Sequence, residues 1–393
     1  MDFGRLDRDA RKKIPRPDPE IQVFRGGTIP VCEPTLQGNE KRYILECLKR
    51  NWVSSHGDFV SRFEQAFAKK VGARYGVACS SGTAALHMAL AALSLKPGDE
   101  VILPTFTMIA TVNAVTYVGA KPVLVDADPE TWNMDVSEIA KGITRRTKVL
   151  LPVHIYGHPV DMDPLLDLAR RRGLLVVEDA AEAHGALYKG RIVGNLGDAG
   201  AFSFFANKII VTGEGGIVVT DDRRIAEFCR GFRSYAFSKG VHFWHQFIGY
   251  NYRMTNLQAA IGLAQLERFE ELVRARRRNA GLYTRFLKKV PGITTPPEST
   301  DVRSVFWMYG ILVDKPYPLS RDGLRRRLAR HGIETRSFFI PVHWQRPFQE
   351  MFHGQRFPVA EDLCAKGFYL PSSSSLTEKE IRFISSVITH PKG

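Results

Sequence analysis

Cysteine is scarce in this sequence, and its arrangement excludes two classes of protein. The 393 residues include 5 cysteines, an odd number with no C-x-x-C pair (Cys32, Cys47, Cys79, Cys229 and Cys364). Such an arrangement provides neither a disulfide framework nor a zinc site. Because disulfide-poor chains are typical of reducing compartments, we expect a cytoplasmic protein.

The sequence also lacks an apolar leader and a clear membrane span. It begins MDFGRLDRDARKKIPRPDPE, which is charged and contains proline, so we interpret residues 1–28 as a mobile arm. Residues 101–120 carry no charge and are long enough to cross a bilayer. They contain Pro104, Asn113 and four threonines, and they start like a strand and continue like a helix. This pattern favours a buried strand–turn–helix, and no membrane partner is expected.

Acidic residues are outnumbered by basic ones, which gives a formal net charge of +14. Arginines cluster at residues 169–173, 274–279 and 324–332, where they share helical segments with Leu or Val. Such segments are typical of the outer faces of amphipathic helices. No nucleic-acid recognition motif accompanies them, so no nucleic-acid partner is expected. A phosphorylated small molecule suits the basic balance.

Short apolar, β-branched runs alternate with helical segments in the first half of the chain. The runs cover residues 75–78, 100–104, 121–126, 148–154, 174–179, 200–205 and 215–220. Fully apolar strands are expected where helices cover both faces of a mostly parallel sheet. This half is therefore predicted to be an α/β domain, residues 29–256.

The pattern changes after Asp221. Residues 257–290 have strong helical periodicity and are predicted to form one long element with a break. A strand is predicted at 306–313, and a last helix near 375–388, where Thr377 and Glu380 are spaced as a capping box. Residues 257–393 are thus predicted to form a linking helix and a smaller α+β domain.

Three segments at predicted strand ends carry the chemistry, because open α/β sheets bind ligands at the carboxyl ends of their strands. In CSSGTAALHMAL (79–90), small residues open a helix whose N–H groups suit a phosphate, although capping alone explains the pattern equally well. Asp179 ends an apolar strand, where a carboxylate needs a partner, either a protonated cofactor nitrogen or a structural arginine. Glu182 and His184 follow within about a turn.

The third segment, AFSFFANKIIVTGEGGIVVT (201–220), places Lys208 among phenylalanines. Desolvation by Phe202, Phe204 and Phe205, with nearby positive charge, would lower the pKa of Lys208 and free its amine for Schiff-base chemistry. A phosphate site, an acid for a pyridinium and a reactive lysine are together what pyridoxal 5′-phosphate (PLP) requires.

With these motifs in place, the sequence resembles the DegT/DnrJ/EryC1/StrS sugar aminotransferases over residues 29–393. The matching stretches include SSGTAALHMAL, PTFTMIATVNAV, VEDAAEAHGA, FSFFANKIIVTGEGGIVVT and GYNYRMTNLQAAIGLAQLE. The resemblance implies a type I, aspartate aminotransferase-like fold with a mostly parallel seven-stranded sheet, a PLP cofactor and a homodimer. Within the family, IPVCEPTLQGNE and TRSFFIPVHWQRPF are most similar to the GDP-perosamine synthases.

The resemblance also implies a role for each matching residue near the cofactor. Lys208 would form the Schiff base and carry the proton, and Asp179 would pair with the pyridinium nitrogen. Glu182, often glutamine in relatives, would lie near the phenolic oxygen. The remaining cofactor contacts would be Gly82, Thr83 and Ser203 at the phosphate, Met108 against the ring, where relatives place an aromatic residue, and Asn251 from the other subunit.

For the nucleotide sugar, the resemblance points to a separate set of residues: Trp52, Ser54, Ser55, His184, Arg253, Tyr309, Phe339 and His343. His242 and His245 have the spacing of an H-x-x-H metal pair, but no third ligand is evident and an aromatic loop is expected instead, with no metal.

The expected reaction transfers an amino group from L-glutamate to the 4-keto group of a nucleotide-linked deoxysugar. Alternatives are another keto sugar (dTDP- or UDP-linked, or a sugar acid such as an octulosonate), a sugar dehydratase and a non-catalytic regulator. The dehydratases of this fold carry histidine at the Schiff-base position, where this chain has Lys208. A regulator would need a DNA-reading domain, and the 28 residues before Ile29 are too few and too polar for one.

Overall fold

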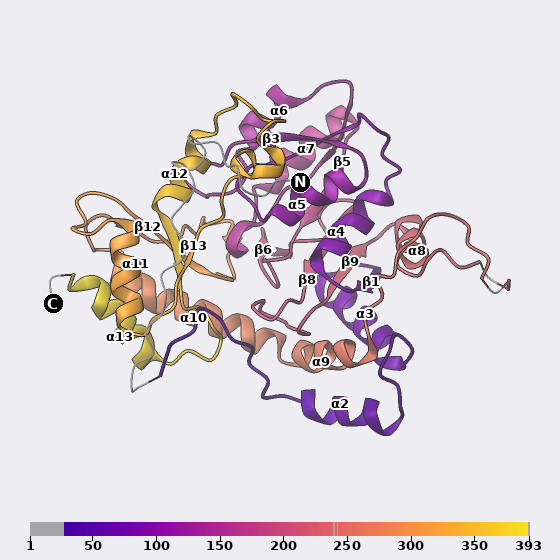
Figure 1. The fold of residues 1–393 in the computed structure, drawn as a ribbon, viewed down its shortest axis with the longest axis horizontal. Helices are drawn as coiled ribbons and strands as arrows, with labels where there is room; N and C mark the ends of the chain where they lie inside the picture. Colours follow the sequence, from indigo (N-terminus) through magenta and orange to yellow (C-terminus); the bar gives the residue numbers. More distant parts are fainter. Residues whose placement is uncertain (1–26, 239, 242, 392–393) are drawn as a thin grey trace.

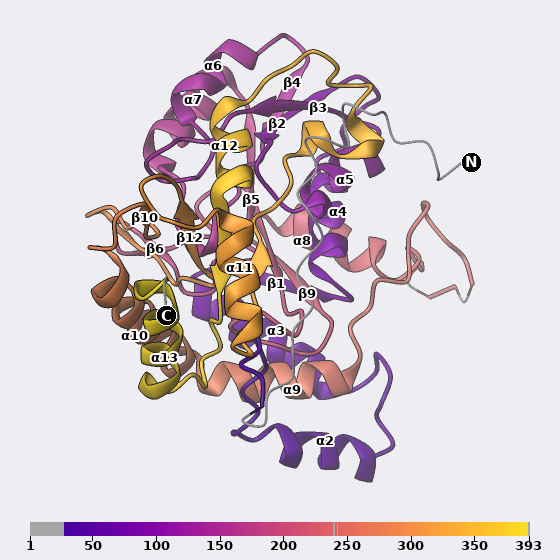
Figure 2. The same ribbon diagram turned by 60° about the vertical axis from the view of Figure 1, so that its left-hand side comes forward.

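The structure, a computed structural model, describes residues 27–238, 240–241 and 243–391 (Figures 1 and 2). The arm expected at residues 1–28 therefore lies, except for Gly27 and Thr28, outside the described residues. Within the described part, no helix is both long enough and apolar enough to cross a membrane.

The centre of the molecule is a seven-stranded sheet with strand order β1-β9-β8-β5-β4-β2-β3. Strand β9 runs antiparallel to both of its neighbours, whereas the pairs from β8 to β3 are parallel. The strands are β1 (Tyr75–Cys79), β2 (Glu100–Pro104), β3 (Lys121–Val125), β4 (Thr147–Leu150), β5 (Leu175–Asp179), β8 (Ala199–Ser203) and β9 (Gly216–Thr220). All seven predicted runs are strands of this sheet, so the predicted mostly parallel α/β architecture is confirmed.

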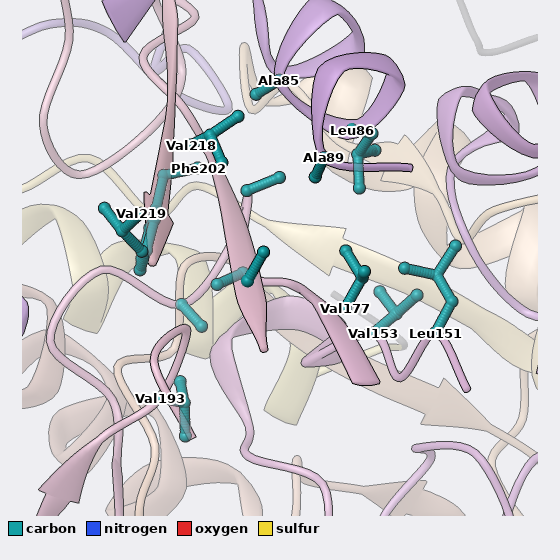
Figure 3. Close-up of a cluster of buried hydrophobic side chains, with 14 of the residues drawn as sticks. Ala85, Leu86, Ala89, Leu151, Val153, Val177, Val193, Phe202, Val218 and Val219 are labelled. Atoms are coloured by element: carbon teal, nitrogen blue, oxygen red, sulfur yellow. The ribbon is translucent and has the colours of Figure 1, made fainter. Parts of the chain in front are cut away.

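These strands are mostly apolar because helices cover both faces of the sheet. Figure 3 shows Ala85, Leu86 and Ala89 of one helix facing side chains of the sheet. Each fully buried Val or Leu in such a layer contributes roughly 1.5–3 kcal/mol. The covering helices are α3 (Asp58–Val71), α4 (Gly82–Ala91), α5 (Ile109–Tyr117), α6 (Ile139–Gly142), α7 (Met162–Arg172) and α8 (Arg223–Phe232). Residues 101–120 form β2, a turn and α5, as predicted.

The long helical segment breaks at Arg268, where the backbone leaves helical geometry (φ −106°). The first part, α9 (Asn256–Glu267), packs on α2 (Glu40–Lys49) and α3. The second part, α10 (Phe269–Leu287), runs toward a second sheet (Figure 1). The predicted single element with a break is therefore observed.

The second sheet has four strands and its own buried cluster, which includes Tyr283, Tyr309 and Phe368. Its strands are β10 (Ile293–Thr294), β12 (Tyr309–Val313), β14 (Gly367–Leu370) and β13 (Arg336–Ser337). Its helices are α11 (Arg321–Arg330), α12 (Pro358–Lys366) and α13 (Glu378–Thr389). The predicted capping box of Thr377 and Glu380 starts α13. The domain bounds at residues 28/29 and 256/257 stay a prediction.

Smaller elements complete the chain. Strands β6 (Leu187–Tyr188), β7 (Arg191–Ile192) and β11 (Val302–Arg303) form a third sheet. Short 3₁₀ turns lie at η1 (Val136–Glu138), η2 (Ile155–Gly157), η3 (Val342–Trp344) and η4 (Arg346–Phe348).

Candidate active site

The three chemistry-bearing strand ends meet in one cavity of about 380 Å³. We call it the Lys208 cavity. Seven of the residues predicted to bind the cofactor line it, namely Gly82, Thr83, Met108, Asp179, Glu182, Ser203 and Lys208. Phe339, which was predicted to contact the substrate, lines it as well. Segments separated by more than a hundred residues in the chain thus supply one site.

One wall of the cavity is the start of helix α4. The Ser81 hydroxyl caps this helix by accepting from the Ala84 N–H at 3.1 Å. A Cβ on Gly82 would lie 2.7 Å from the Ser203 Cβ, so only glycine lets the helix start reach the end of β8. The first N–H groups of a helix lack intrahelical partners and carry partial positive charge, which suits a phosphate.

The acid at the end of β5 is held by two donors. Asp179 is 5% exposed; its Oδ2 accepts from the Thr111 hydroxyl at 2.8 Å and its Oδ1 from the Ala181 N–H at 3.2 Å. Burial raises the pKa of Asp179, and the Thr111 hydrogen bond is the main opposing influence. The carboxylate therefore sits in a desolvated place where a cationic partner would stabilise it.

The amine of Lys208 lies between a carboxylate and an aromatic ring. Its Nζ is 3.8 Å from Glu182 Oε1 and 3.6 Å from the centroid of the Trp307 ring. Burial lowers the pKa of Lys208, while the negative charges of Glu182 and Asp179 oppose the shift. The direction is the one predicted from the sequence.

The cause of that shift differs from the prediction. Phe202 and Phe204 pack against Phe67 in the core and do not line the cavity, although Phe205 does. The expected positive charge beside Lys208 is replaced by two carboxylates. The indole of Trp307, from a different part of the chain, covers the amine instead.

Glu182 is the second carboxyl group of the cavity. Its Oε2 accepts from the Tyr156 N–H at 2.8 Å, which fixes the side chain in place. Burial raises the pKa of Glu182 to about 7, against the opposing charge of Lys208. Glu182 can therefore take up or release a proton near neutral pH, which a glutamine amide at the same position cannot do.

An aromatic wall closes the cavity on the side of the second sheet. Trp307, Phe339 and Tyr369 line it, and the Trp307 Nε1–H donates to the Asn207 carbonyl at 2.8 Å. Four residues of the site were not predicted from the sequence, namely Trp307, Tyr369, Asn207 and Thr111. The only sequence signal for Trp307 is its place in the FWMY segment, and from that segment the predicted substrate-binding residue is Tyr309.

Three residues expected at the substrate lie elsewhere. Tyr309 is buried in the second sheet's core, with its ring 4.9 Å from that of Tyr283 and its hydroxyl 2.8 Å from that of Thr284. His184 is fully buried among phenylalanine rings, where burial lowers its pKa to about 3. A histidine so enclosed is neutral and does not reach the cavity.

His343 is also buried outside the Lys208 cavity. Its Nδ1 is 2.9 Å from the Thr105 hydroxyl and its Nε2 is 3.4 Å from Glu361. The ring therefore bridges the end of β2 to helix α12, which is a structural position.

The other expected substrate residues gather around a second cavity of about 620 Å³, which we call the Arg253 cavity. Ser55 and Arg253 line it, and Asn251 accepts from the Arg253 Nε–H at 2.9 Å beside it. Trp52 and Ser54 lie on the adjoining exposed loop, whose backbone is held by Asn256. Within one chain, this group is separate from the residues around Lys208.

The segment between α8 and α9 projects from the body of the molecule (Figures 1 and 2). Its residues Ser234, Phe237 and Ser238 line the Arg253 cavity. Backbone bridges from Ser234 to Asn251 and from Phe237 to His245 fold it back on itself. It exposes six aromatic side chains, which are Tyr235, Phe237, Phe243, Trp244, Phe247 and Tyr250. Exposed apolar clusters of this kind mark interaction surfaces.

The H-x-x-H pair lies on the same segment. His242 is outside the described residues, and the His245 Nδ1 is 2.7 Å from the Tyr235 carbonyl. Among residues 27–238, 240–241 and 243–391, no group of three or more His, Cys, Asp or Glu is placed to hold a metal ion.

The residues of the Lys208 cavity fit PLP by their chemistry. The glycine-lined start of α4 suits a phosphate, the buried Asp179 suits a cationic ring nitrogen, and the Lys208 amine suits an aldehyde. All three groups face one space.

Comparison with known proteins agrees with this geometry. Residues 34–389 match the DegT/DnrJ/EryC1/StrS aminotransferase family. The chain is 46% identical to GDP-perosamine synthase of Escherichia coli O157:H7 over 360 residues, which cover 92% of this chain and 97% of the relative. It is 47% identical to GDP-perosamine synthase of Caulobacter vibrioides over 354 residues, which cover 90% and 95%. The crystal structure of S. venezuelae DesV in complex with a ketimine intermediate superposes with a TM-score of 0.85 at 34% identity, covering 90% of this chain and 94% of DesV.

Proposed function

Because the chain belongs to the DegT/DnrJ/EryC1/StrS aminotransferase family and is a PLP-dependent sugar aminotransferase, we propose that it aminates the 4-keto group of a nucleotide-linked deoxysugar with L-glutamate as donor. The preferred substrate is GDP-4-keto-6-deoxy-D-mannose and the product is GDP-perosamine. The single observation that carries the proposed site is the meeting of Lys208, Asp179 and the start of α4 in one cavity.

Different residues of the Lys208 cavity would anchor the cofactor, move the proton and pair with the ring nitrogen. When bound, the cofactor supplies an electron sink that stabilises negative charge on the carbon losing its proton. Lys208 would anchor the cofactor through Nζ and, once its amine is released, move a proton at Nζ between the donor carbon and the cofactor. Its lowered pKa favours a neutral amine for that step. Asp179 would keep the ring nitrogen protonated by pairing with it.

Other groups in the cavity would bind and orient. Gly82, Thr83 and Ser203 would hold the phosphate, and Glu182 would lie near the phenolic oxygen. Met108, which is half exposed to solvent at the start of α5 and lines the cavity, would pack on the ring face. Phe339 and Trp307 would exclude water from the amine.

The proposed substrate rests on the relatives. Both GDP-perosamine synthases align along nine-tenths or more of this chain, and the family match over residues 34–389 includes the segments that form both cavities. The Arg253 cavity, with its guanidinium and serine, suits the diphosphate and hydroxyl groups of a nucleotide sugar.

The active enzyme is proposed to be a homodimer in which the Arg253 cavity of one subunit faces the Lys208 cavity of the other. Asn251 would then reach the cofactor phosphate of the partner, and Ser55 and Arg253 would contact the substrate there. The exposed aromatic segment between α8 and α9 supports this arrangement, because a second subunit would cover it.

Borohydride reduction tests the cofactor assignment. Reduction of the PLP-loaded enzyme, followed by digestion and mass spectrometry, should place the reduced coenzyme on Lys208 in the peptide spanning residues 206–210. Reduced coenzyme on a different lysine would refute the role given to Lys208.

A panel of keto sugars tests the substrate. With glutamate as donor, we expect the highest kcat/KM for GDP-4-keto-6-deoxy-D-mannose. A higher value for a dTDP- or UDP-linked keto sugar, or for a keto sugar acid, would replace the proposed substrate and leave the aminotransferase intact.

A further inference from the structure

We propose that Thr111, supported by Thr107, is a positioning residue that orients the Asp179 carboxylate and keeps it ionised for cofactor binding. This inference rests on the proposed function in one respect, namely that Asp179 pairs with the cofactor ring. Neither threonine lies among the residues that the sequence patterns marked as functional.

The three side chains form a continuous buried chain. The Thr107 and Thr111 hydroxyl oxygens are 2.8 Å apart, and the Thr111 hydroxyl oxygen is 2.8 Å from Asp179 Oδ2. Thr111 is fully buried, and Thr107 and Asp179 are nearly so. Solvent therefore does not compete for these hydrogen bonds.

The direction of each hydrogen bond follows from the chemistry of the groups. An ionised carboxylate only accepts, so Thr111 must donate its single hydroxyl hydrogen to Asp179. Thr111 then has only lone pairs to offer Thr107, and Thr107 must be the donor of the second bond. Both donors point toward Asp179, and each strengthens the next.

This chain has a definite electrostatic effect on the acid. Burial raises the pKa of Asp179, and the Thr111 hydrogen bond opposes that rise more than the Ala181 N–H or the charges of Lys208 and His154. Without the hydroxyl, the carboxyl would keep its proton to higher pH, and in its protonated form it offers no negative charge to a protonated ring nitrogen.

The neighbouring threonine of the same helix shows what an ordinary position looks like. Thr116, also in α5 and half-buried, donates to the Asn113 carbonyl at 2.7 Å, a local bond to the helix backbone. Thr111 instead donates its hydroxyl hydrogen to the side chain of Asp179, 68 residues away in the sequence. Thr116 therefore provides a matched control in the same helix.

The test compares cofactor affinity among variants of the full chain. PLP dissociation constants would be measured by equilibrium dialysis across pH for wild type, Thr111→Val, Thr111→Ser and Thr116→Val. We expect Thr111→Val to weaken PLP binding by roughly 10- to 100-fold near neutral pH, the loss of a hydrogen bond to a charged group. The acid limb of its affinity profile should move to higher pH. Thr111→Ser should restore most of the affinity, and Thr116→Val should match wild type.

Other titratable groups around Asp179 are held constant in this comparison. Lys208 follows β8, Glu182 follows β5 and His154 follows β4, and all three are present in every variant of that series. A difference between Thr111→Val and Thr116→Val therefore reports on the Thr111 hydroxyl. The melting temperature of each variant without PLP checks folding, and Thr107→Val, with a smaller effect in the same direction, substitutes if Thr111→Val does not fold.

A double variant decides whether Thr111 acts through Asp179. In an Asp179→Asn background, Thr111→Val should have little further effect on PLP affinity. An equal loss in both backgrounds, or a Thr111→Val profile identical to that of wild type, would overturn the inference. Failure of the wild type to bind PLP at all would instead overturn the proposed function, so the two failures are distinguishable.

Discussion

The Lys208 cavity and the Arg253 cavity are both lined by residues that the sequence marked as functional, but their surroundings are opposite. The first has buried titratable groups fixed by hydrogen bonds from within the same chain. The second is larger and is flanked by exposed aromatic rings. The contrast is consistent with the proposed homodimer, in which one chain supplies the reactive groups of a site and the Arg253 cavity of the second chain would complete it.

Removal of the Lys208 amine is expected to have the largest effect. Lys208→Ala should lower multiple-turnover transamination by at least about 10³-fold, because both the covalent anchor and the proton carrier are lost. Amino sugar formation would be followed by chromatography. Lys189→Ala, which removes an exposed lysine paired with Asp163, is the control and should keep wild-type activity. Full turnover by Lys208→Ala would remove the basis for placing catalysis in this cavity.

Removing the acid should have the next largest effect. Asp179→Asn should slow proton removal from glutamate by on the order of 10²-fold and weaken PLP retention, because a buried charge partner is replaced by a neutral amide. Loss of the α-proton can be followed by deuterium exchange in D₂O. Normal exchange would identify a different acid.

Mixed dimers test whether the Lys208 cavity of one subunit works with the Arg253 cavity of the other. Asn251→Ala and Lys208→Ala should each be weak alone, but subunits of the two variants refolded together should recover activity. One of the two sites in such a dimer has Lys208 from one chain and Asn251 from the other. Absence of any recovery in dimers verified by light scattering would place both residues in the same subunit's site.

A smaller effect is expected at the aromatic wall. Trp307→Phe keeps a ring over Lys208 but removes the hydrogen bond to the Asn207 carbonyl. We expect about a 10-fold loss in kcat with little change in PLP affinity, since one neutral hydrogen bond that positions the amine is lost. Steady-state kinetics and dialysis measure the two quantities. Equal losses in both would assign Trp307 to cofactor binding.

The smallest effect concerns the pH dependence of stability. The pKa of Glu182 is raised to about 7 by burial, so the folded chain holds a proton that the unfolded chain releases above its ordinary pKa. Stability therefore falls as pH rises through this range. Glu182→Gln should remove this contribution. Its free energy of unfolding should therefore fall less between pH 5 and pH 8 than that of wild type, by on the order of 1 kcal/mol. Urea unfolding at both pH values, without PLP, is the measurement, and parallel pH profiles would contradict it.

The fold was largely predictable because its signals are local. Seven apolar runs became the seven strands of the main sheet, since each strand is buried on both faces. The capping box at Thr377 likewise needs only three intervening peptide units to form. The lowered pKa of Lys208 was also expected, because any enclosed amine loses solvation.

The residues that were missed or misplaced depend on where the chain turns. Trp307 lies in a bend before strand β12 and lines the Lys208 cavity, whereas Tyr309 is the first residue of β12 and lies in the second core. Tyr309 was chosen from the same motif but faces the second core. The role of Thr111 could not be predicted from the sequence because its partner, Asp179, lies 68 residues away. No local pattern encodes such a pairing.

The hydrogen bond from the Trp307 indole to the Asn207 carbonyl lies beside the boundary between the two cores, because Trp307 belongs to the main core whereas its chain neighbours Phe306 and Tyr309 belong to the second. Trp307 belongs to the segment that leads into the second sheet, and Asn207 is the residue before Lys208. Substitutions that loosen the packing around Tyr283 or Phe368 would therefore displace that segment and shift the Lys208 amine. Substitutions in the second core, far from the Lys208 amine, would then be detected as changes in reaction rate.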